Sequence, residues 1–200
     1  NDALLWAVML GPIGNFIWAV QSRSVPIFYG RKTPQLVVAA APGVLLNAGA
    51  ALIAIGGADV ETGQWSGGLG FVLAGTALVS LPPICGSVYG QAKRLRPRAR
   101  SAARFVVTAN IAAMAAGALM VWGGLEVMGG DDYASWGAFE QRDAARHLLG
   151  VGTITMLIFG MARLVAPVFA LERTEAGVPM LLERLPFWLL LGSLVLRAGV

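Results

Sequence analysis

His147 is the residue of this chain best suited to metal chemistry, and it is the only histidine among the 200 residues. It begins a run without charge that lasts until Arg163. Imidazole binds haem iron and copper and relays protons near neutral pH. We therefore expect His147 to be a cofactor-binding residue and metal ligand. The alternative is an interfacial histidine that is hydrogen-bonded to a loop.

Arg197 is the second candidate for cofactor binding. If the last helix enters the membrane at Leu185, Arg197 lies about 18 Å along it, near the middle of the bilayer. A charge at that depth is costly and is usually paired. No acidic residue lies in the uncharged core of the other spans, so the expected partner is a ligand carboxylate such as a haem propionate, or a group outside this chain. Alternatively, a tilted helix lets Arg197 reach the outer interface.

Arg23 and Arg163 each end an apolar run, and each is followed by a proline and then a phenylalanine. A cation at a helix C-terminus is favourable and accounts for both positions. A shared anion site is the alternative. Three asparagines inside the apolar runs are expected to form hydrogen bonds between helices. They are Asn15, Asn47 and Asn110.

The remaining residue types exclude several kinds of chemistry. Cys85 is the only cysteine, which excludes an intrachain disulfide and a thiolate metal cluster, and we expect it to be a buried structural thiol. A single histidine excludes a paired-histidine metal site. The chain has neither a GxxxxGK[ST] phosphate loop nor a nucleophile elbow.

The composition is that of an integral membrane protein. Hydrophobic residues make up 56% of the chain and charged residues 13%, with a mean hydropathy of +0.68. A soluble domain usually carries about 25% charged residues. We expect residues 1–200 to form a single transmembrane domain. Because it begins at Asn1 and stops inside an apolar run, we expect it to be a fragment of a longer chain.

Six apolar runs predict an all-α, polytopic transmembrane bundle of about six spans. The runs cover residues 3–22, 33–58, 62–92, 105–125, 147–171 and 185–200. Pro12 and Gly14 predict a kink in the first run. The third run is too long for one span, so we place its helix between Trp65 and Tyr89, with a bend or break at Pro82.

The loops alternate in charge, and this predicts their orientation. The loops at residues 23–32 and 93–104 are basic, whereas the long loop at residues 126–146 is net acidic. Lysine and arginine favour the cytoplasmic side, so we expect a multi-pass membrane protein whose basic loops face the cytoplasm and whose acidic loop faces the periplasm or the outside. The loop at 93–104 is expected to touch anionic lipid. It lacks the interleaved aromatic residues that stack on bases, so no nucleic-acid partner is expected.

The first and fifth helices suggest an internal repeat. Aligning Arg23 with Arg163 sets Ala7 opposite His147, and an apolar helix follows each copy. The two pairs, helices 1–2 and 5–6, would form a parallel repeat. Convergence of two membrane helices is the alternative. Small residues spaced for close packing are expected to bring helices together, namely Gly86 with Gly90 and Ala113 with Gly117.

Three segments resemble the NnrS family of haem- and copper-containing bacterial membrane proteins. HLLGVGTITMLIFGMARLVAP is similar to family helices that begin with histidine and end with Gly-Met and an arginine. PFWLLLGSLVLRAGV and FIWAVQSRSVPIFYG resemble two other family helices. The resemblance implies a helical bundle in the bacterial inner membrane with a periplasmic acidic loop, a haem cofactor, possible copper, and His147 as the metal ligand. Because the family has several histidines and this chain has one, it further implies a degenerate member.

These observations leave two main hypotheses for function. The first is an NnrS-like, haem-associated membrane protein linked to electron transfer or nitric-oxide metabolism. The second is a cofactor-free accessory subunit of a larger respiratory or photosynthetic complex. Both imply other membrane subunits as partners. A small-solute transporter half is a third hypothesis, and it requires the three asparagines to converge near the midplane.

Overall fold

The chain folds into a bundle of helices. The computed structural model describes residues 2–28, 31–57, 63–85, 97–130, 140–169 and 180–198, and the regular elements within these ranges are all helical. In chain order they are α1 (Asp2–Val8), η1 (Met9–Ile13), α2 (Gly14–Phe28), α3 (Leu36–Gly56), α4 (Gly63–Ile84), α5 (Pro97–Met128), α6 (Glu140–His147), η3 (Leu148–Thr155), α7 (Met156–Phe169) and α8 (Met180–Ala198). The expected all-α class is confirmed.

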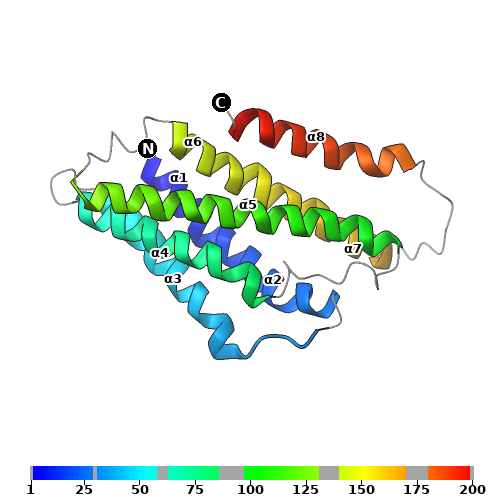
Figure 1. The fold of residues 1–200 in the computed structure, drawn as a ribbon. Coiled ribbons are helices and arrows are strands. Elements are labelled where there is room, and N and C mark those ends of the chain that lie inside the picture. Colours follow the sequence, from blue (N-terminus) through cyan, green and yellow to red (C-terminus); the bar gives the residue numbers. More distant parts are fainter. Residues whose placement is uncertain are drawn as a thin grey trace.

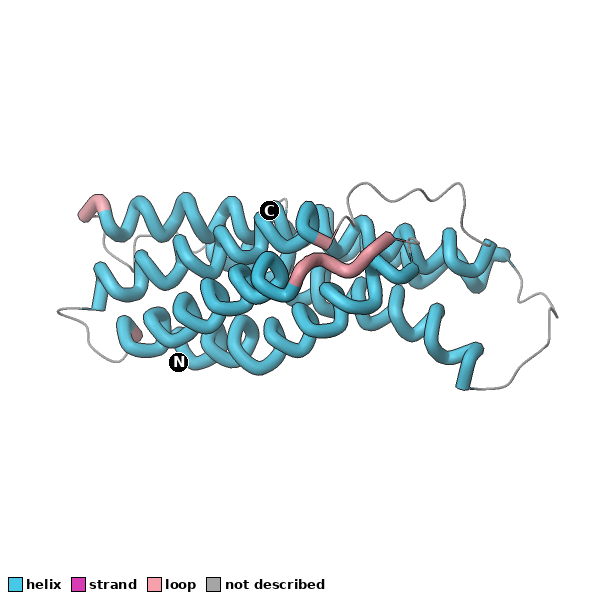
Figure 2. The backbone as a smooth tube through the Cα atoms, turned by 90° about the horizontal axis from the view of Figure 1, so that it is seen from below, coloured by secondary structure: helices cyan, strands magenta, loops and turns pink. Residues whose placement is uncertain are grey.

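The helices of the described ranges form six rods that lie roughly along one axis, three in each direction. The rods α1–η1–α2, α4 and α6–η3–α7 run one way, and α3, α5 and α8 run the other (Figure 1). Figure 2 shows the same elongated bundle from below. We call the end that holds the start of α1 and the end of α8 the Asp143 end. The opposite end, where α2, α4 and α7 finish, is the Arg163 end.

Five segments among the described residues are long and apolar enough to cross a membrane. They are Asp2–Ile27, Leu36–Gly56, Gln64–Ile84, Ser101–Met128 and Gln141–Arg163. Each is at least 21 residues long, which covers the hydrocarbon core of about 30 Å. The sixth expected span corresponds to α8, which lies alongside but carries Glu183, Arg184 and Arg197 among its 19 residues.

Two helices begin before their apolar runs. The fourth run was expected at residues 105–125, but α5 has 32 residues and starts at Pro97. Arginine and alanine are good helix formers, so the helix continues through the basic segment. The sixth helix was expected from Leu185, but α8 begins at Met180. The third helix ends at Ile84, just after the two prolines, and Tyr89 lies outside the described residues.

Two rods are interrupted by π-helical turns. The expected departure at Pro12 is present, because η1 contains this proline. In η3 the hydroxyls of Thr153 and Thr155 each donate a hydrogen bond to the carbonyl five residues earlier, at 3.0 Å. Aligning Arg23 with Arg163 places η1 opposite residues 149–153, inside η3. The hypothesis of a parallel repeat therefore gains a second feature at the same register.

Glycines hold α3, α4 and α5 in close contact. A Cβ on Gly75 would lie 2.5 Å from the carbonyl oxygen of Gly117, and one on Gly49 would lie 2.6 Å from that of Gly70. The expectation that Gly117 serves packing is confirmed, and Ala113 beside it is buried. Gly86 and Gly90 lie outside the described residues. Small residues allow this approach of backbones in membranes.

The Gly75→Ala variant is expected to unfold more easily by about 1–3 kcal/mol, because the added methyl group forces α4 away from α5. The matched control is Gly192→Ala on α8, where an added Cβ meets nothing within 4 Å. The control should be neutral or slightly stabilising, since alanine favours helix more than glycine. Unfolding in a detergent titration measures both. Equal stabilities of the two variants would contradict the close contact.

Candidate functional site

His147 is the last residue of α6, where the helix passes into η3. Its Nδ1 lies 2.9 Å from the backbone carbonyl oxygen of Asp143, one turn earlier. A carbonyl can only accept a hydrogen bond, so the proton of the neutral ring is on Nδ1. Nε2 is then left with its lone pair. The side chain is 29% exposed, so Nε2 stands at the edge of the bundle rather than in its core.

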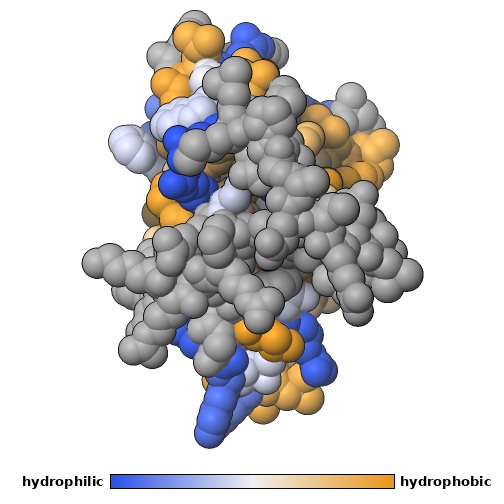
Figure 3. All heavy atoms as spheres, turned by 90° about the vertical axis from the view of Figure 1, so that its right-hand side faces the viewer, coloured by the Kyte–Doolittle hydropathy of each residue, from blue (hydrophilic) through white to orange (hydrophobic). Residues whose placement is uncertain are grey.

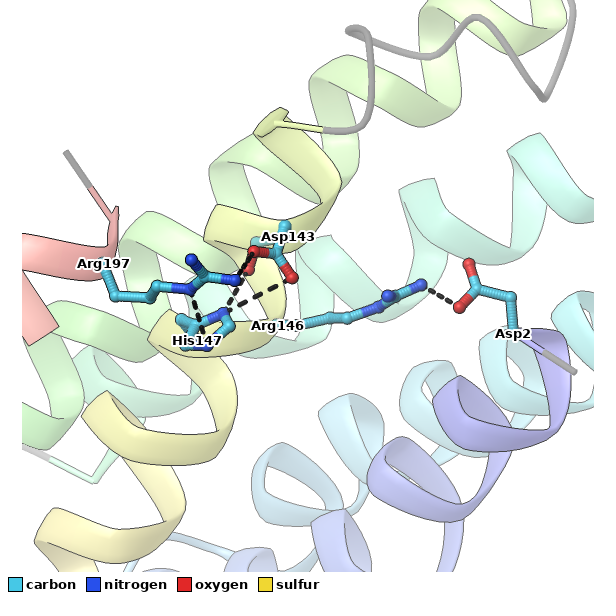
Figure 4. Close-up of polar contacts among 5 residues, drawn as sticks. All are labelled: Asp2, Asp143, Arg146, His147 and Arg197. Atoms are coloured by element: carbon cyan, nitrogen blue, oxygen red, sulfur yellow. Dashed lines mark hydrogen bonds and ion pairs between the residues drawn. The ribbon is translucent and has the colours of Figure 1, made fainter. Parts of the chain in front are cut away.

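Arg197 comes from the last turn of α8 and meets His147 at this edge. Its Nε donates to Nε2 of His147 at 3.4 Å, and its Nη2 lies 3.2 Å from a carboxylate oxygen of Asp143. Figure 4 shows the three side chains facing one another between α6 and α8. The two candidate residues that the sequence nominated separately are therefore neighbours.

Arg197 has a different partner in this fold from the one expected. It lies in the last turn of α8, which ends at Ala198, and its side chain is 59% exposed. Its partner is Asp143, which the sequence placed in a loop but which belongs to α6. The alternative of an arginine that reaches the outer interface agrees with this geometry.

A second ion-pair group lies on the neighbouring face of α6. Arg146 and Arg142 both pair with Asp2 of α1, with 3.4 Å between Arg142 Nη1 and the carboxylate. The Arg146 guanidinium also lies 5.5 Å from the centre of the buried Trp6 ring. These contacts hold α6 against α1 and so help to fix the position of His147 along the bundle axis (Figure 4).

Sequence reasoning missed Asp2 and the role of Asp143. The available pattern was the spacing in α6, where Arg142 and Arg146 are four residues apart, as are Asp143 and His147. Residues four apart share a helix face, so the pattern predicts two adjacent polar stripes. The charged groups of the two stripes and their partners are Asp2, Arg142, Asp143, Arg146 and Arg197. With His147 neutral, their charges sum to +1.

The geometry of His147 fits a single axial ligand of a haem. Metal-bound histidines usually donate their other ring N–H to a carbonyl or carboxylate, which sets the tautomer and the ring orientation. The bond from Nδ1 to the Asp143 carbonyl has this form. Arg197 Nε occupies the direction of Nε2, so the arginine has to turn aside before a metal binds.

The described part of the chain does not bring together the ligands of a copper site. Within the described ranges, no group of three or more histidine, cysteine, aspartate or glutamate side chains could hold a metal ion. Cu²⁺ sites usually take several imidazole, thiolate or carboxylate ligands. Of the two expected cofactors, only haem, which needs one or two axial ligands, is compatible with the residues around His147.

Arg23 and Arg163 show separate environments. Arg163 Nη1 donates to Ser101 Oγ at 2.7 Å, and its guanidinium lies 5.0 Å from the centre of the Phe105 ring. The side chain of Arg23 is exposed on α2. The contacts of Arg163 therefore lead to α5, and they give no support to an anion site shared with Arg23.

The asparagines form hydrogen bonds between helices, as expected. Asn15 and Asn47 exchange two amide hydrogen bonds of 2.8 Å between α2 and α3, and each also donates to a backbone carbonyl. Asn110 accepts a bond of 3.2 Å from Gln21 in the buried interior. Asn15 and Asn47 thus bond to each other whereas Asn110 bonds to Gln21, and the small-solute transporter stays a hypothesis.

Cys85 is buried and free, as expected, directly after the third membrane-crossing segment. Burial raises the pKa of its thiol from 9.0 to about 11, because it disfavours the thiolate.

The thiolate is the reactive form of Cys85, so maleimide should label the folded protein at least about 100-fold more slowly than the unfolded chain at pH 8. The neutral thiol also contributes to the free energy of unfolding. This contribution is complete below pH 9 and is lost as the pH rises towards 11. A labelling rate equal to that of the unfolded chain would contradict burial.

No family model, curated protein or solved structure matches the chain significantly.

Proposed function

We propose that this chain is an NnrS-like, haem-associated protein of the bacterial inner membrane, linked to electron transfer or nitric-oxide metabolism. The main observation in support is the hydrogen bond from His147 Nδ1 to the Asp143 carbonyl, which leaves Nε2 as the metal-binding atom. The resemblance of this helix to NnrS helices motivates the choice of haem. His147 lies in the first part of the membrane-crossing segment Gln141–Arg163, so a haem that it held would lie towards one membrane face.

The residues around His147 have distinct roles in this proposal. The Asp143 carbonyl holds the imidazole in one tautomer and orientation. Arg197 carries a mobile positive charge beside Nε2 and can pair with a haem propionate when it leaves Asp143. Arg146, paired with Asp2, keeps α6 in place. When bound, the haem supplies the redox or nitric-oxide-binding chemistry.

The proposal also covers the source of a second ligand for the haem iron and the orientation of the protein in the membrane. One histidine would provide one ligand to the haem, and a second histidine ligand would come from outside these 200 residues, either from further chain or from a neighbouring membrane subunit. Arg23, Arg31 and Lys32 lie towards the Arg163 end, as do the basic residues at the start of α5. The positive-inside rule then puts this end in the cytoplasm and His147 on the periplasmic side.

One observation favours a cofactor-free accessory subunit as the second candidate. Arg197 satisfies both Nε2 of His147 and the Asp143 carboxylate, so the three side chains are paired without a ligand. In this case, the cluster ties α8 to α6, and the protein packs into a larger complex.

The haem content of the protein isolated with its natural partners tests the proposal. We expect a pyridine haemochrome assay to give about one haem for each copy of this chain, and a His147→Ala preparation to lose it. A folded complex without haem at this stoichiometry would reject the first candidate and leave the accessory subunit.

A further inference from the structure

A small hollow lies at the Arg163 end, between α5 and α8. Its lining is half basic or hydroxylic and half aromatic: Ser101, Arg104, Phe105, Arg184, Phe187 and Trp188. Arg163 of α7 reaches the same place, because its guanidinium donates to Ser101 and lies over Phe105. Figure 3 looks onto this end, where hydrophilic and hydrophobic side chains lie next to one another. Two helices, α5 and α8, therefore line the hollow, and Arg163 of α7 contacts two of the lining residues.

The charges around the hollow favour an anion. Arg104 and Arg184 line the hollow and are exposed, and Arg163 contacts the lining residues Ser101 and Phe105. None of the described residues that line it is acidic. Guanidinium groups bind phosphate through two parallel N–H donors, so a pair of arginines from two helices is well suited to a phosphate group.

The apolar side of the hollow favours a lipid over a free ion. The ring of Phe187 packs edge-on against Phe105 at 5.1 Å and against Trp188 at 5.4 Å. Trp188 is 59% exposed, so one side of this aromatic row is uncovered. Tryptophan prefers the membrane interface, where its ring touches acyl chains below the headgroups.

The depth of the hollow agrees with the headgroup region. The uncharged runs of α5 and α8 begin directly after Arg104 and Arg184. The hollow therefore lies where charged side chains give way to the apolar part of these two helices. Phospholipid phosphates occupy this level of a bilayer.

We propose that one anionic phospholipid binds on the surface over this hollow, whose interior of about 10 Å³ is too small for a phosphate group, with the phosphate held by Arg104 and Arg184 and the upper acyl chain against Trp188. This site differs from the diffuse attraction expected of the basic loop, because it needs residues of α5 and α8 together. The lipid joins α8 to α5 at the end of the bundle opposite to His147. The proposal is independent of the haem.

The experiment measures lipid binding to the full chain with its partners in a neutral detergent. The probes are phosphatidylglycerol, phosphatidylcholine and inorganic phosphate, and the readouts are retained lipid in native mass spectrometry and the shift of the unfolding temperature. The test variant is Arg104→Gln with Arg184→Gln. The control, Arg23→Gln with Lys32→Gln, removes two exposed charges that do not line the hollow.

We expect the wild type and the control to bind phosphatidylglycerol with equal affinity, and the test variant to bind it about 30-fold more weakly, since each basic residue near anionic lipid contributes about 1 kcal/mol. If both double variants lost the same affinity for phosphatidylglycerol, the attraction would be unspecific, and this result would overturn the site. Equal binding of phosphatidylcholine would overturn it as well. Stabilisation by inorganic phosphate to the same extent as by the lipid would replace the lipid with a free ion. Unfolding without lipid shows whether each variant folds.

Discussion

Replacing His147 with alanine is expected to reduce haem affinity by at least about 100-fold in the chain isolated with its partners. A ligand-supporting hydrogen bond alone is worth about 10- to 100-fold in metal affinity, and the ligand itself is worth more. The chain has no second histidine to take over. Titration with haemin, followed by the Soret absorption, measures the loss.

Asp143→Asn is the matched control for this variant. It keeps the backbone carbonyl that holds Nδ1 of His147, and it removes the carboxylate charge that lies 3.2 Å from Arg197 Nη2 and 3.6 Å from Nδ1 of His147. Haem affinity should therefore stay within a few-fold of the wild type. If Asp143→Asn loses haem as completely as His147→Ala, the binding depends on the integrity of the cluster and not on imidazole ligation.

Replacing Asp2 with asparagine is expected to destabilise the protein by about 2–3 kcal/mol. Asp2 is the partner of both Arg142 and Arg146, whose side chains are only 12% and 20% exposed. Removing one member of a buried ion pair typically costs about 3–5 kcal/mol, because the remaining charge is left without a partner. The 34% exposure of Asp2 lowers this figure, since water then screens part of the interaction.

A double-mutant cycle with Arg146→Met checks the origin of this effect. Once Arg146 is replaced, the Asp2→Asn change should cost less than in the wild type, by about 1 kcal/mol or more. Glu126→Gln is the control, because Glu126 accepts a hydrogen bond from the neutral indole of Trp122 and should contribute little. Unfolding in a detergent titration gives all the free energies. Additive costs in the cycle would show that the pair has no net interaction.

The sequence predicted the kind of fold because the relevant physics is local. Long uncharged runs can only be satisfied by helices in a bilayer, and Pro12 interrupts a helix wherever it lies. The ends were less accurate. Pro97 and Met180 begin helices outside the apolar runs, since a helix end depends on capping and helix propensity as well as on hydropathy.

The candidate site was predicted only as separate residues. His147 and Arg197 stand out because histidine is unique here and arginine is costly in an apolar helix. Their contact depends on how α8 aligns with α6, which no local pattern encodes. The partner Asp143 was missed because the acidic segment reads as a loop, whereas its last part is helical. Likewise, Asn15 and Asn47 were expected to bond between helices, but their pairing depends on the packing of α2 on α3.

The central claim is that Nε2 of His147 ligates haem iron, and one measurement tests it directly. Because the chain has a single histidine, ring ¹⁵N-histidine labelling of this chain alone marks one imidazole. The labelled chain is assembled with unlabelled partners, and pulsed electron paramagnetic resonance is recorded on the ferric haem. We predict one strongly coupled imidazole nitrogen that changes to ¹⁵N on labelling. A haem whose nitrogen couplings are unchanged by the label would contradict ligation by His147.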